Sequence, residues 1–327
     1  MDFRTLVHIA ASETAIVHSH SILLMGSCFA ENMGQKLQNA KFQVDVNPFG
    51  VLYNPTSIKK ALQRLVEGNI YKETDLFEEQ GRWQSFDHHS SFSFSTKEET
   101  LLKMNERLSA SAEKLKKADY LMLTFGTAWV YRLQESGEIV SNCHKMPAKA
   151  FTRSRLTVDE IVEDYSALIK SLRNNNPRLK VILTVSPIRH WKDGANGNNL
   201  SKAILLLAVE TLNSRLEDVF YFPSYEIVLD ELRDYRFFAD DMLHPSTQAV
   251  DYVWERFSET YFSTETKKLL KEIAKIQQAV AHRPFNREGK EYGRFCELVL
   301  NQIATMEKEY LGIDFEREKT TLRLNTI

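Results

Sequence analysis

The sequence predicts a doubly wound α/β fold, with helices packed on both faces of a mostly parallel sheet. Four short apolar runs bounded by turn residues recur along the chain, near residues 21–26, 118–126, 179–187 and 218–224. Helical patterns lie between and around them, near residues 30–41, 56–67, 97–117, 157–173 and 199–216. Apolar runs without strict alternation are typical of strands buried on both faces of a parallel sheet. Strands that alternate with helices then define the fold class, with ligands expected at the carboxyl ends of the strands.

The composition limits the classes of protein that fit this chain. Its 327 residues can build one large α/β domain or a domain with an appendage, and the net charge of −2 favours neither nucleic acid nor an anionic membrane as a partner. The N-terminal residues lack the basic stretch and apolar core of a signal peptide, and no run reaches membrane-spanning length. Three widely spaced cysteines argue against a disulfide framework. We expect a cytoplasmic monomer or homodimer without a cofactor.

The first predicted strand leads into a candidate catalytic turn. The apolar run ends at Gly26, and two side chains that can act as nucleophiles follow at once, Ser27 and Cys28. Helix-compatible residues begin at about Ala30. A strand that runs through a tight turn into a helix N-terminus is how several hydrolase folds present an attacking group. A thiol can attack an acyl carbon as a hydroxyl can, so Cys28 and Ser27 are both candidate nucleophiles.

The remaining segments predict insertions and a helical extension. Residues 83–94 and 124–147 read as extended or looped insertions. After about residue 262, two amphipathic helical patterns are separated by a break at 282–286; their apolar stripes are Leu269, Ile273, Ile276 and Val280, then Tyr292, Phe295, Val299, Ile303, Met306 and Tyr310. We predict an α/β domain over residues 1–262 and a helical hairpin over 263–327 packed on it, with a dimer contact or a lid as alternatives. Residues 316–327 read as a frayed tail or an edge strand.

A second chemistry-bearing stretch lies just before the last helical pattern of the main domain. Asp241 and His244 are three residues apart, ahead of Pro245 and Ser246. If the loop turns back, the carboxylate can hold one imidazole nitrogen while the other faces a nucleophile. The simpler interpretation is a loop at a helix start that Ser246 caps.

These two stretches together resemble SGNH (GDSL-type) hydrolases, and more closely the GSCFA family. The signature GSCFA stands at residues 26–30, and NPFGVLYNP (47–55), NCHKMP (142–147), VSPIRH (185–190) and DELRDYRFFADDMLHPS (230–246) also look like that family. The resemblance covers roughly residues 20–260. It implies a flavodoxin-like parallel sheet and acyl-ester chemistry.

The resemblance also implies roles for individual residues. In SGNH hydrolases the nucleophilic serine follows the first strand as G-D-S. The register therefore places Cys28 at the nucleophile, whereas the usual chemistry favours Ser27, so both remain candidates. Backbone N–H groups of this turn and a loop glycine, matched by Gly50, are the implied oxyanion donors.

The third implied donor, an asparagine in G-x-N-D, has no counterpart here. The chain reads Gly126, Thr127, Ala128 and Trp129 at that place. Asn47, Asn142 or the Thr127 hydroxyl are candidate substitutes.

Loop histidines and cations complete the set of candidate site residues. His88, His89, His144, His190 and His244, with Asp87 and Asp241, suit a divalent metal chemically, but no pair of them shows metal-binding spacing. We therefore expect His89 and His144 to line a substrate cleft and no metal to be bound. Arg189 and Lys192 follow a strand end and can hold a carboxylate or phosphate of the substrate.

These observations lead to a functional hypothesis. We expect a hydrolase or acyltransferase that acts on an acyl ester, with an acylated carbohydrate or a small metabolite ester as substrate by fold analogy. The chemistry would pass through a covalent acyl-enzyme on Cys28 or Ser27, with His244 as base and Asp241 orienting it. The alternatives are an inactive SGNH-like ligand-binding protein and a metal-dependent hydrolase.

Overall fold

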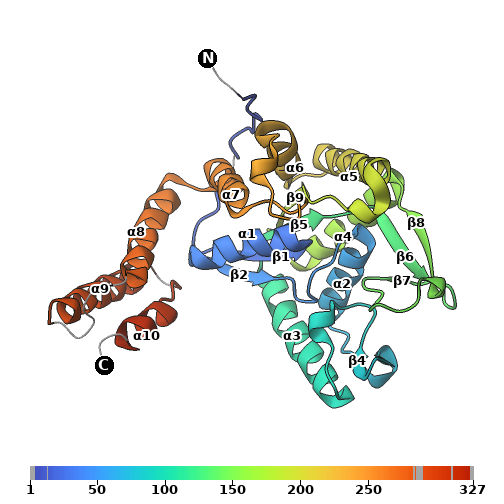
Figure 1. Ribbon diagram of the computed structural model, residues 1–327, viewed down its shortest axis with the longest axis horizontal. Coiled ribbons are helices and arrows are strands. Elements are labelled where there is room, and N and C mark those ends of the chain that lie inside the picture. Colours follow the sequence, from blue (N-terminus) through green and yellow to red (C-terminus); the bar gives the residue numbers. More distant parts are fainter. Residues whose placement is uncertain (1–3, 13, 283, 285–289, 311, 325–327) are drawn as a thin grey trace. The chain divides into compact units, whose positions relative to one another are not determined.

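The computed structural model describes residues 4–12, 14–282, 284, 290–310 and 312–324 (Figure 1). Packing divides the chain into two compact units. Unit 1 comprises Met1–Ile9, Ser21–Gly34 and Val44–Arg256, and unit 2 comprises Ala10–His20, Gln35–Gln43 and Phe257–Ile327. The predicted boundary at residue 262 falls close to the last of these divisions. Unit 2 also contains two earlier segments, so each unit is built from separate stretches of the chain.

The centre of unit 1 is a five-stranded sheet. Its strands in spatial order are β10 (Val219–Tyr221), β9 (Lys180–Val185), β5 (Tyr120–Phe125), β1 (Ser21–Gly26) and β2 (Gln43–Val46). The pairings of β1 with β5, β5 with β9, and β9 with β10 are parallel. Counted along the chain, this is the flavodoxin-like order 2-1-3-4-5, which confirms the predicted fold class.

Each face of this sheet is apolar, as expected for strands covered on both sides. One set of alternating strand residues packs in a single core with α2 (Pro55–Glu67), α3 (Lys97–Lys117), α4 (Val158–Asn175) and α5 (Gly194–Arg215). That set is Leu23, Met25, Leu121, Leu123, Phe125, Val181, Leu183, Val185 and Val219. The intervening residues, Ile22, Leu24, Tyr120, Met122 and Ile182, are buried as well. The period of two places the side chains of the three central strands in packed layers on both faces.

Local signals in the sequence set where the helices begin. The Asn54 side chain accepts the Ser57 N–H at 2.8 Å, and Pro55 is the first residue of α2. Thr157 and Glu160 form a capping box at the start of α4. The remaining helices of the α/β region are α1 (Cys28–Asn39), α6 (Ser224–Glu226) and α7 (Thr247–Tyr261), with a π-helix over Ile227–Leu232.

Two small antiparallel sheets are inserted near the carboxyl ends of the central strands. One pairs β3 (Phe77–Glu79) with β4 (Arg82–Gln84), and the other has the order β7 (Ile139–Val140), β6 (Trp129–Leu133), β8 (Phe151–Arg155). The predicted insertions at 83–94 and 124–147 are therefore confirmed as extended and looped structure.

The described C-terminal residues of unit 2 are helical. They form α8 (Thr264–Ala281), α9 (Lys290–Glu309) and α10 (Glu316–Leu324). Their shared core contains Leu269, Ile273, Ile276, Tyr292, Cys296, Val299, Ile303, Ile313, Phe315 and Leu322. This confirms both predicted helical stripes except for Tyr310, which follows α9 and is exposed. Most of the predicted break at 282–286 lies outside the described residues. No helix in the described part of the chain is long and apolar enough to cross a membrane.

The prediction for the last segment was wrong. Residues 316–324 form a helix rather than a frayed tail or an edge strand. Phe315, directly before the helix, and Leu322 within it are both fully buried and join the core that α8 and α9 share. Many charged residues around these two obscured the short apolar stripe in the sequence.

Candidate active site

The turn after β1 is fixed by hydrogen bonds from two neighbouring segments. The Gly26 N–H donates to Asn47 Oδ1 at 2.9 Å, and the Gly26 carbonyl accepts the Leu52 N–H at 2.9 Å. The Ser27 N–H donates to the Thr124 carbonyl of β5 at 3.3 Å. Gly26 has φ +143°, and a Cβ there would lie 2.2 Å from the Thr124 carbonyl oxygen. Only glycine fits this position, because both the conformation and the space exclude a side chain.

The two candidate nucleophiles differ in exposure. Ser27 is 2% exposed, and its Oγ accepts the Phe29 N–H at 3.3 Å, which resembles a helix-capping role. Cys28 is the first residue of α1, and its side chain is half-buried. Among the described residues, the Cys28 backbone N–H has no hydrogen-bond acceptor. The start of α1 therefore offers an unpaired N–H beside the thiol.

Asp241 and His244 form the orienting pair that the sequence predicts. Asp241 Oδ2 lies 2.5 Å from His244 Nδ1, and Asp241 Oδ1 accepts the N–H groups of Leu243 and His244, both at 2.9 Å. The backbone bonds from His244 and Leu243, together with the imidazole, lower the pKa of Asp241 to about 2. The carboxylate is thus charged at neutral pH and leaves Nε2 as the free imidazole nitrogen. Ser246 also accepts the Ala249 N–H at 3.3 Å, so the capping role exists beside this pair.

Cys28 and His244 line the same pocket, which has a volume of about 900 Å³. Its wall also contains Ser27, Tyr53, Thr127, Trp129, Tyr131, Cys143, Ser186, His190 and Trp191. No hydrogen bond joins Cys28 Sγ to His244 among the described residues. A volume of this order suits a small organic ligand.

Two of the predicted oxyanion residues lie behind the pocket wall rather than in it. The Gly50 N–H donates to the Asn47 carbonyl at 2.8 Å, and a Cβ on Gly50 would lie 2.3 Å from His89 Cβ. Asn47 Oδ1 holds Gly26, while Asn47 Nδ2 is buried without a partner. Neither residue is part of the pocket lining. In this arrangement Asn47 holds the nucleophile turn, and Gly50 leaves room for His89.

The segment after β5 carries no asparagine toward the pocket. Ala128 is fully buried, and its N–H donates to Ser201 Oγ at 2.7 Å. Thr127 lines the pocket, but its hydroxyl is 3.0 Å from Ser201 Oγ and accepts the Trp129 N–H. Gly126 is not part of the lining, and its N–H donates to the Tyr53 carbonyl at 2.8 Å. The Thr127 hydroxyl is thus already engaged with its neighbours.

His144, Asn142 and His89 all line the pocket and have local partners. His144 Nε2 lies 2.8 Å from the Ser85 carbonyl, and burial lowers the pKa of His144. Asn142 Oδ1 accepts the His144 N–H at 2.9 Å. His89 Nδ1 accepts the Ser91 N–H at 3.2 Å. These side chains therefore build the pocket wall, as the sequence predicts for a cleft.

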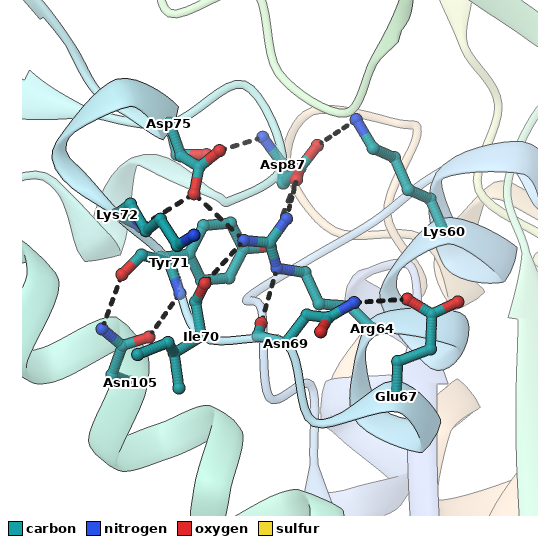
Figure 2. Close-up of polar contacts among 11 residues, drawn as sticks. Lys60, Arg64, Glu67, Asn69, Ile70, Tyr71, Lys72, Asp75, Asp87 and Asn105 are labelled. Carbon is teal, nitrogen blue, oxygen red and sulfur yellow. Dashed lines mark hydrogen bonds and ion pairs between the residues drawn. The ribbon is translucent and has the colours of Figure 1, made fainter.

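The loop that carries His89 is anchored by a charged cluster around Asp87 (Figure 2). Asp87 accepts from Lys60 at 2.7 Å and from the Tyr71 hydroxyl at 3.2 Å. The Arg64 guanidinium lies 3.5 Å from the centre of the Tyr71 ring and bonds Asp75 at 3.1 Å. The imidazole of the adjacent His88 is fully buried. It fixes the loop backbone together with this cluster. Asp87 and His88 thus serve structure rather than the pocket surface.

The pocket is rich in cations. Arg153 pairs with Asp193 and lies over the rings of Trp129 and Tyr131. Four other cations of the lining have no carboxylate partner among the described residues: Arg82, Lys145, Arg189 and Lys192. Arg189 also lines an adjoining pocket of about 420 Å³ next to the Asp241 loop. The lining therefore favours an anionic group on a bound molecule.

Two bases near the pocket have lowered pKa values, the fully buried Lys202 and the half-buried His190 of the pocket wall. Lys202 is fully buried and its Nζ donates to the Gly126 and Ser186 carbonyls, each at 2.6 Å, so it joins the ends of β5 and β9. Burial lowers the pKa of Lys202 to about 7. Burial and the Lys202 charge lower the pKa of His190 to about 4, which keeps that imidazole neutral at pH 7.

The described residues contain no group of three or more histidine, cysteine or acidic side chains placed to hold a metal ion. His88 is buried in a ring cluster with Phe49, Tyr71 and Phe92, and His144 contacts Phe77. The His244 imidazole bonds Asp241. The structure thus distributes the predicted histidines among separate environments.

Sequence reasoning missed Tyr53. Its hydroxyl lies 3.6 Å from Cys28 Sγ, and its ring meets His190 edge-on with 5.5 Å between ring centres. The Tyr53 carbonyl accepts the N–H groups of both Gly126 and Thr127, at 2.8 and 3.0 Å. The available signal was its position, since Tyr53 directly precedes the Asn54 cap on the loop after β2, at the carboxyl edge of the sheet.

The fold and the site together define a flavodoxin-like α/β protein with a strand–turn–helix cysteine and an aspartate–histidine loop at the carboxyl edge of its sheet. The chain belongs to the GSCFA family. The GSCFA family model matches residues 21–257, and the model of the GSCFA domain protein, C-terminal domain, matches residues 273–325. This confirms the resemblance seen in the sequence. Among curated proteins no sequence matches the chain.

Solved structures similar to this chain have low sequence identity. A carbohydrate esterase family 3 structure from Talaromyces cellulolyticus is 12% identical, with a TM-score of 0.36 over 78% of this chain and 99% of that chain. A Clostridium thermocellum family 3 carbohydrate esterase is 11% identical, with a TM-score of 0.34 over 78% and 98%. The lipase Lip_vut3 from a goat rumen metagenome is 12% identical, with a TM-score of 0.37 over 75% and 99%.

Proposed function

We propose that this protein is an acyl hydrolase or acyltransferase that forms a covalent acyl-enzyme on Cys28. One observation carries the proposal. A half-buried thiol at the start of α1 lines the same pocket as His244, whose other imidazole nitrogen is 2.5 Å from the Asp241 carboxylate. A nucleophile, a base and a group that orients the base are the parts that acyl transfer requires.

The proposed reaction has two halves. The Cys28 thiol proton passes to His244 Nε2 while Sγ attacks the acyl carbon, and the carbonyl electron pair moves to oxygen. The Cys28 backbone N–H, which is unpaired among the described residues, stabilises that oxyanion. Collapse breaks the bond to the leaving oxygen, which takes the proton from His244. Water or another acceptor then attacks the Cys28 thioester with His244 again as base.

The choice of Cys28 over Ser27 is supported by exposure. Ser27 is 2% exposed and its Oγ already accepts the Phe29 N–H. The Cys28 thiol is more exposed and follows the same turn. The register of the GSCFA signature favours the same residue.

The proposed substrate is an acyl ester of a carbohydrate or a small metabolite that carries an anionic group. The pocket has room for such a molecule, with the aromatic rings of Trp129 and Trp191 in its wall. Arg189 and Lys192, both without a carboxylate partner among the described residues, are the groups proposed to bind the anion.

The test is covalent trapping with an activated acyl ester followed by peptide mass mapping. It compares the wild type with Cys28→Ser, Ser27→Ala and His244→Ala, and uses His8→Ala, an exposed histidine, as the matched control. We expect label on residue 28 that is lost in His244→Ala and kept in Ser27→Ala and His8→Ala. Label on Ser27 with the same dependence on His244 would instead assign a serine esterase.

Cys143 supplies the control for simple thiol modification. It lines the same pocket, and burial raises the pKa of its thiol. All variants are therefore repeated with Cys143→Ser. An absence of His244-dependent label on residues 27 and 28 in both backgrounds would refute the enzymatic proposal and favour a ligand-binding protein.

A further inference from the structure

The site has a side-chain donor that the family resemblance does not assign. The sequence lacks the asparagine expected after β5, and the structure buries Ala128 in its place with its N–H bonded to Ser201. Thr127 is likewise bonded to Ser201, and Asn142 to the His144 N–H. A hydroxyl nevertheless reaches the reacting sulfur, because Tyr53 Oη lies 3.6 Å from Cys28 Sγ.

We propose that Tyr53 is a catalytic residue whose O–H donates first to the Cys28 sulfur and then to the oxyanion of the tetrahedral intermediate. This inference rests on the proposed function. When Sγ attacks, it bonds to the acyl carbon. The oxyanion is bonded to the same carbon, so it lies two bonds from Sγ. A donor that contacts Sγ before attack is therefore close to that oxygen afterwards, and together with the Cys28 N–H it completes a two-donor site.

The position of Tyr53 is fixed from three sides, as a preorganised donor requires. Its carbonyl accepts two N–H groups, from Gly126 and Thr127, and its ring edge meets His190 at 5.5 Å. The next residue, Asn54, is 5% exposed and caps α2. Donors held in place before the reaction need no reorganisation when charge develops.

The hydroxyl also stays protonated. Burial, with the neighbouring Cys28 as the second cause, holds the pKa of Tyr53 far above its ordinary value. Tyr53 is therefore a donor at neutral pH, and it does not compete with His244 as a base. This separates the two roles: His244 moves the proton, and Tyr53 holds the charge.

The experiment measures single-turnover acylation of wild type, Tyr53→Phe, Tyr235→Phe and His244→Ala with an activated acyl ester. The Tyr235 side chain is 73% exposed and outside this pocket, so Tyr235→Phe is a matched loss of a hydroxyl. We expect Tyr53→Phe to acylate about 100-fold more slowly, with an almost unchanged substrate concentration at half-maximal rate. Tyr235→Phe is expected to match the wild type.

A second substrate separates charge stabilisation from a merely structural role. In a thionoester the carbonyl oxygen is replaced by sulfur, which is a weak hydrogen-bond acceptor. The wild type should therefore prefer the oxygen ester more strongly than Tyr53→Phe does. An equal preference in both proteins would overturn the oxyanion role, as would an acylation rate of Tyr53→Phe within twofold of the wild type.

The failure of the underlying function has a different signature. If wild type and His244→Ala acylate equally, the proposed function falls, and the role of Tyr53 falls with it. If only the wild type and Tyr235→Phe keep a rapid His244-dependent acylation, both proposals are supported. Thermal unfolding of Tyr53→Phe close to that of the wild type would exclude a folding defect as the cause.

Discussion

Gly26 is the residue on which the geometry of the candidate nucleophile most depends. It has φ +143°, and the nearest backbone atom to a Cβ would be the Thr124 oxygen at 2.2 Å. That oxygen also accepts the Ser27 N–H, so any shift that makes room for a side chain separates the turn from β5. The thiol position is thus tied to the backbone of the neighbouring strand.

We expect Gly26→Ala to lower the free energy of unfolding by about 3 kcal/mol or more, since strain and overlap add. Gly137→Ala is the control, because Gly137 has φ +73° with no atom within 4 Å of a Cβ. Its expected cost is about 1 kcal/mol, from the backbone conformation alone. Chemical denaturation measures both. Equal losses in the two variants would contradict the role assigned to the Thr124 contact.

The turn could be predicted from the sequence, but the separate roles of the side chains around it could not. An apolar run that ends in glycine, followed by Ser27 and Cys28 and a helix, is a local pattern. Which of the two side chains is the more exposed in the pocket depends on Asn47 and Thr124, which come from distant parts of the chain. Tyr53 was missed for the same reason, because Gly126 and Thr127 hold its backbone.

Among the elements, the segment between β9 and α5 contributes most to the proposed substrate preference. It carries Ser186, Arg189, His190 and Lys192 to the pocket. Lys192 Nζ lies 4.9 Å from the centre of the Tyr131 ring, which holds the cation over the second small sheet. One loop thus combines Arg189 and Lys192, which have no carboxylate partner among the described residues, with the neutral imidazole of His190.

The double variant Arg189→Gln, Lys192→Gln is expected to raise KM about tenfold or more for an ester with a carboxylate or phosphate. KM for a matched neutral ester should change little, and added salt should reduce the difference. Lys170→Gln, an exposed change on α4, is the control. Steady-state kinetics on the two esters give the comparison, and an equal rise in both KM values would argue against an anion site.

The elements that the sequence missed share a physical cause. β2 is a short strand at the edge of the sheet with mixed burial, and it lacks the continuous apolar run that identified the other strands. Its buried carboxylate, Asp45, is paired with Arg107 at 2.5 Å. The helix α10 was missed because charged residues outnumber the apolar ones that reach its core. A strand or helix with a continuous apolar run can be predicted from a single sequence. An element that is stabilised by contacts with a distant segment cannot.

For the whole molecule, the buried Lys202 makes stability depend on pH. The unfolded chain binds its lysine proton below about pH 10.5, whereas the folded protein binds it only below about pH 7. Between these values the unfolded state carries more protons, so the free energy of unfolding rises with pH. The limit is about 1.4 kcal/mol per pH unit for one group.

We expect this rise between about pH 7 and pH 9 in urea denaturation, and we expect Lys202→Met to remove it. The readout is the slope of the unfolding free energy against pH, because the variant also leaves the Gly126 and Ser186 carbonyls without their donor. Lys170→Met, a change of an exposed lysine, should keep the slope. A slope that persists in Lys202→Met would assign the pH dependence to other groups.

The composition of unit 2 has a consequence for how this chain can be divided. Phe42 stacks on His18 and Phe262, the Asn39 carbonyl accepts from Gln277 at 2.6 Å, and Lys41 pairs with Glu318 at 2.7 Å. The C-terminal helices therefore share one packed unit with two early segments, Ala10–His20 and Gln35–Gln43. The second of these contains the second half of α1. A chain truncated after residue 262 would retain these early segments but lose Gln277 and Glu318, which bond to them. The C-terminal region is therefore not an independent module. A chimera that takes this region from another family member must also take residues 10–20 and 35–43 from the same protein.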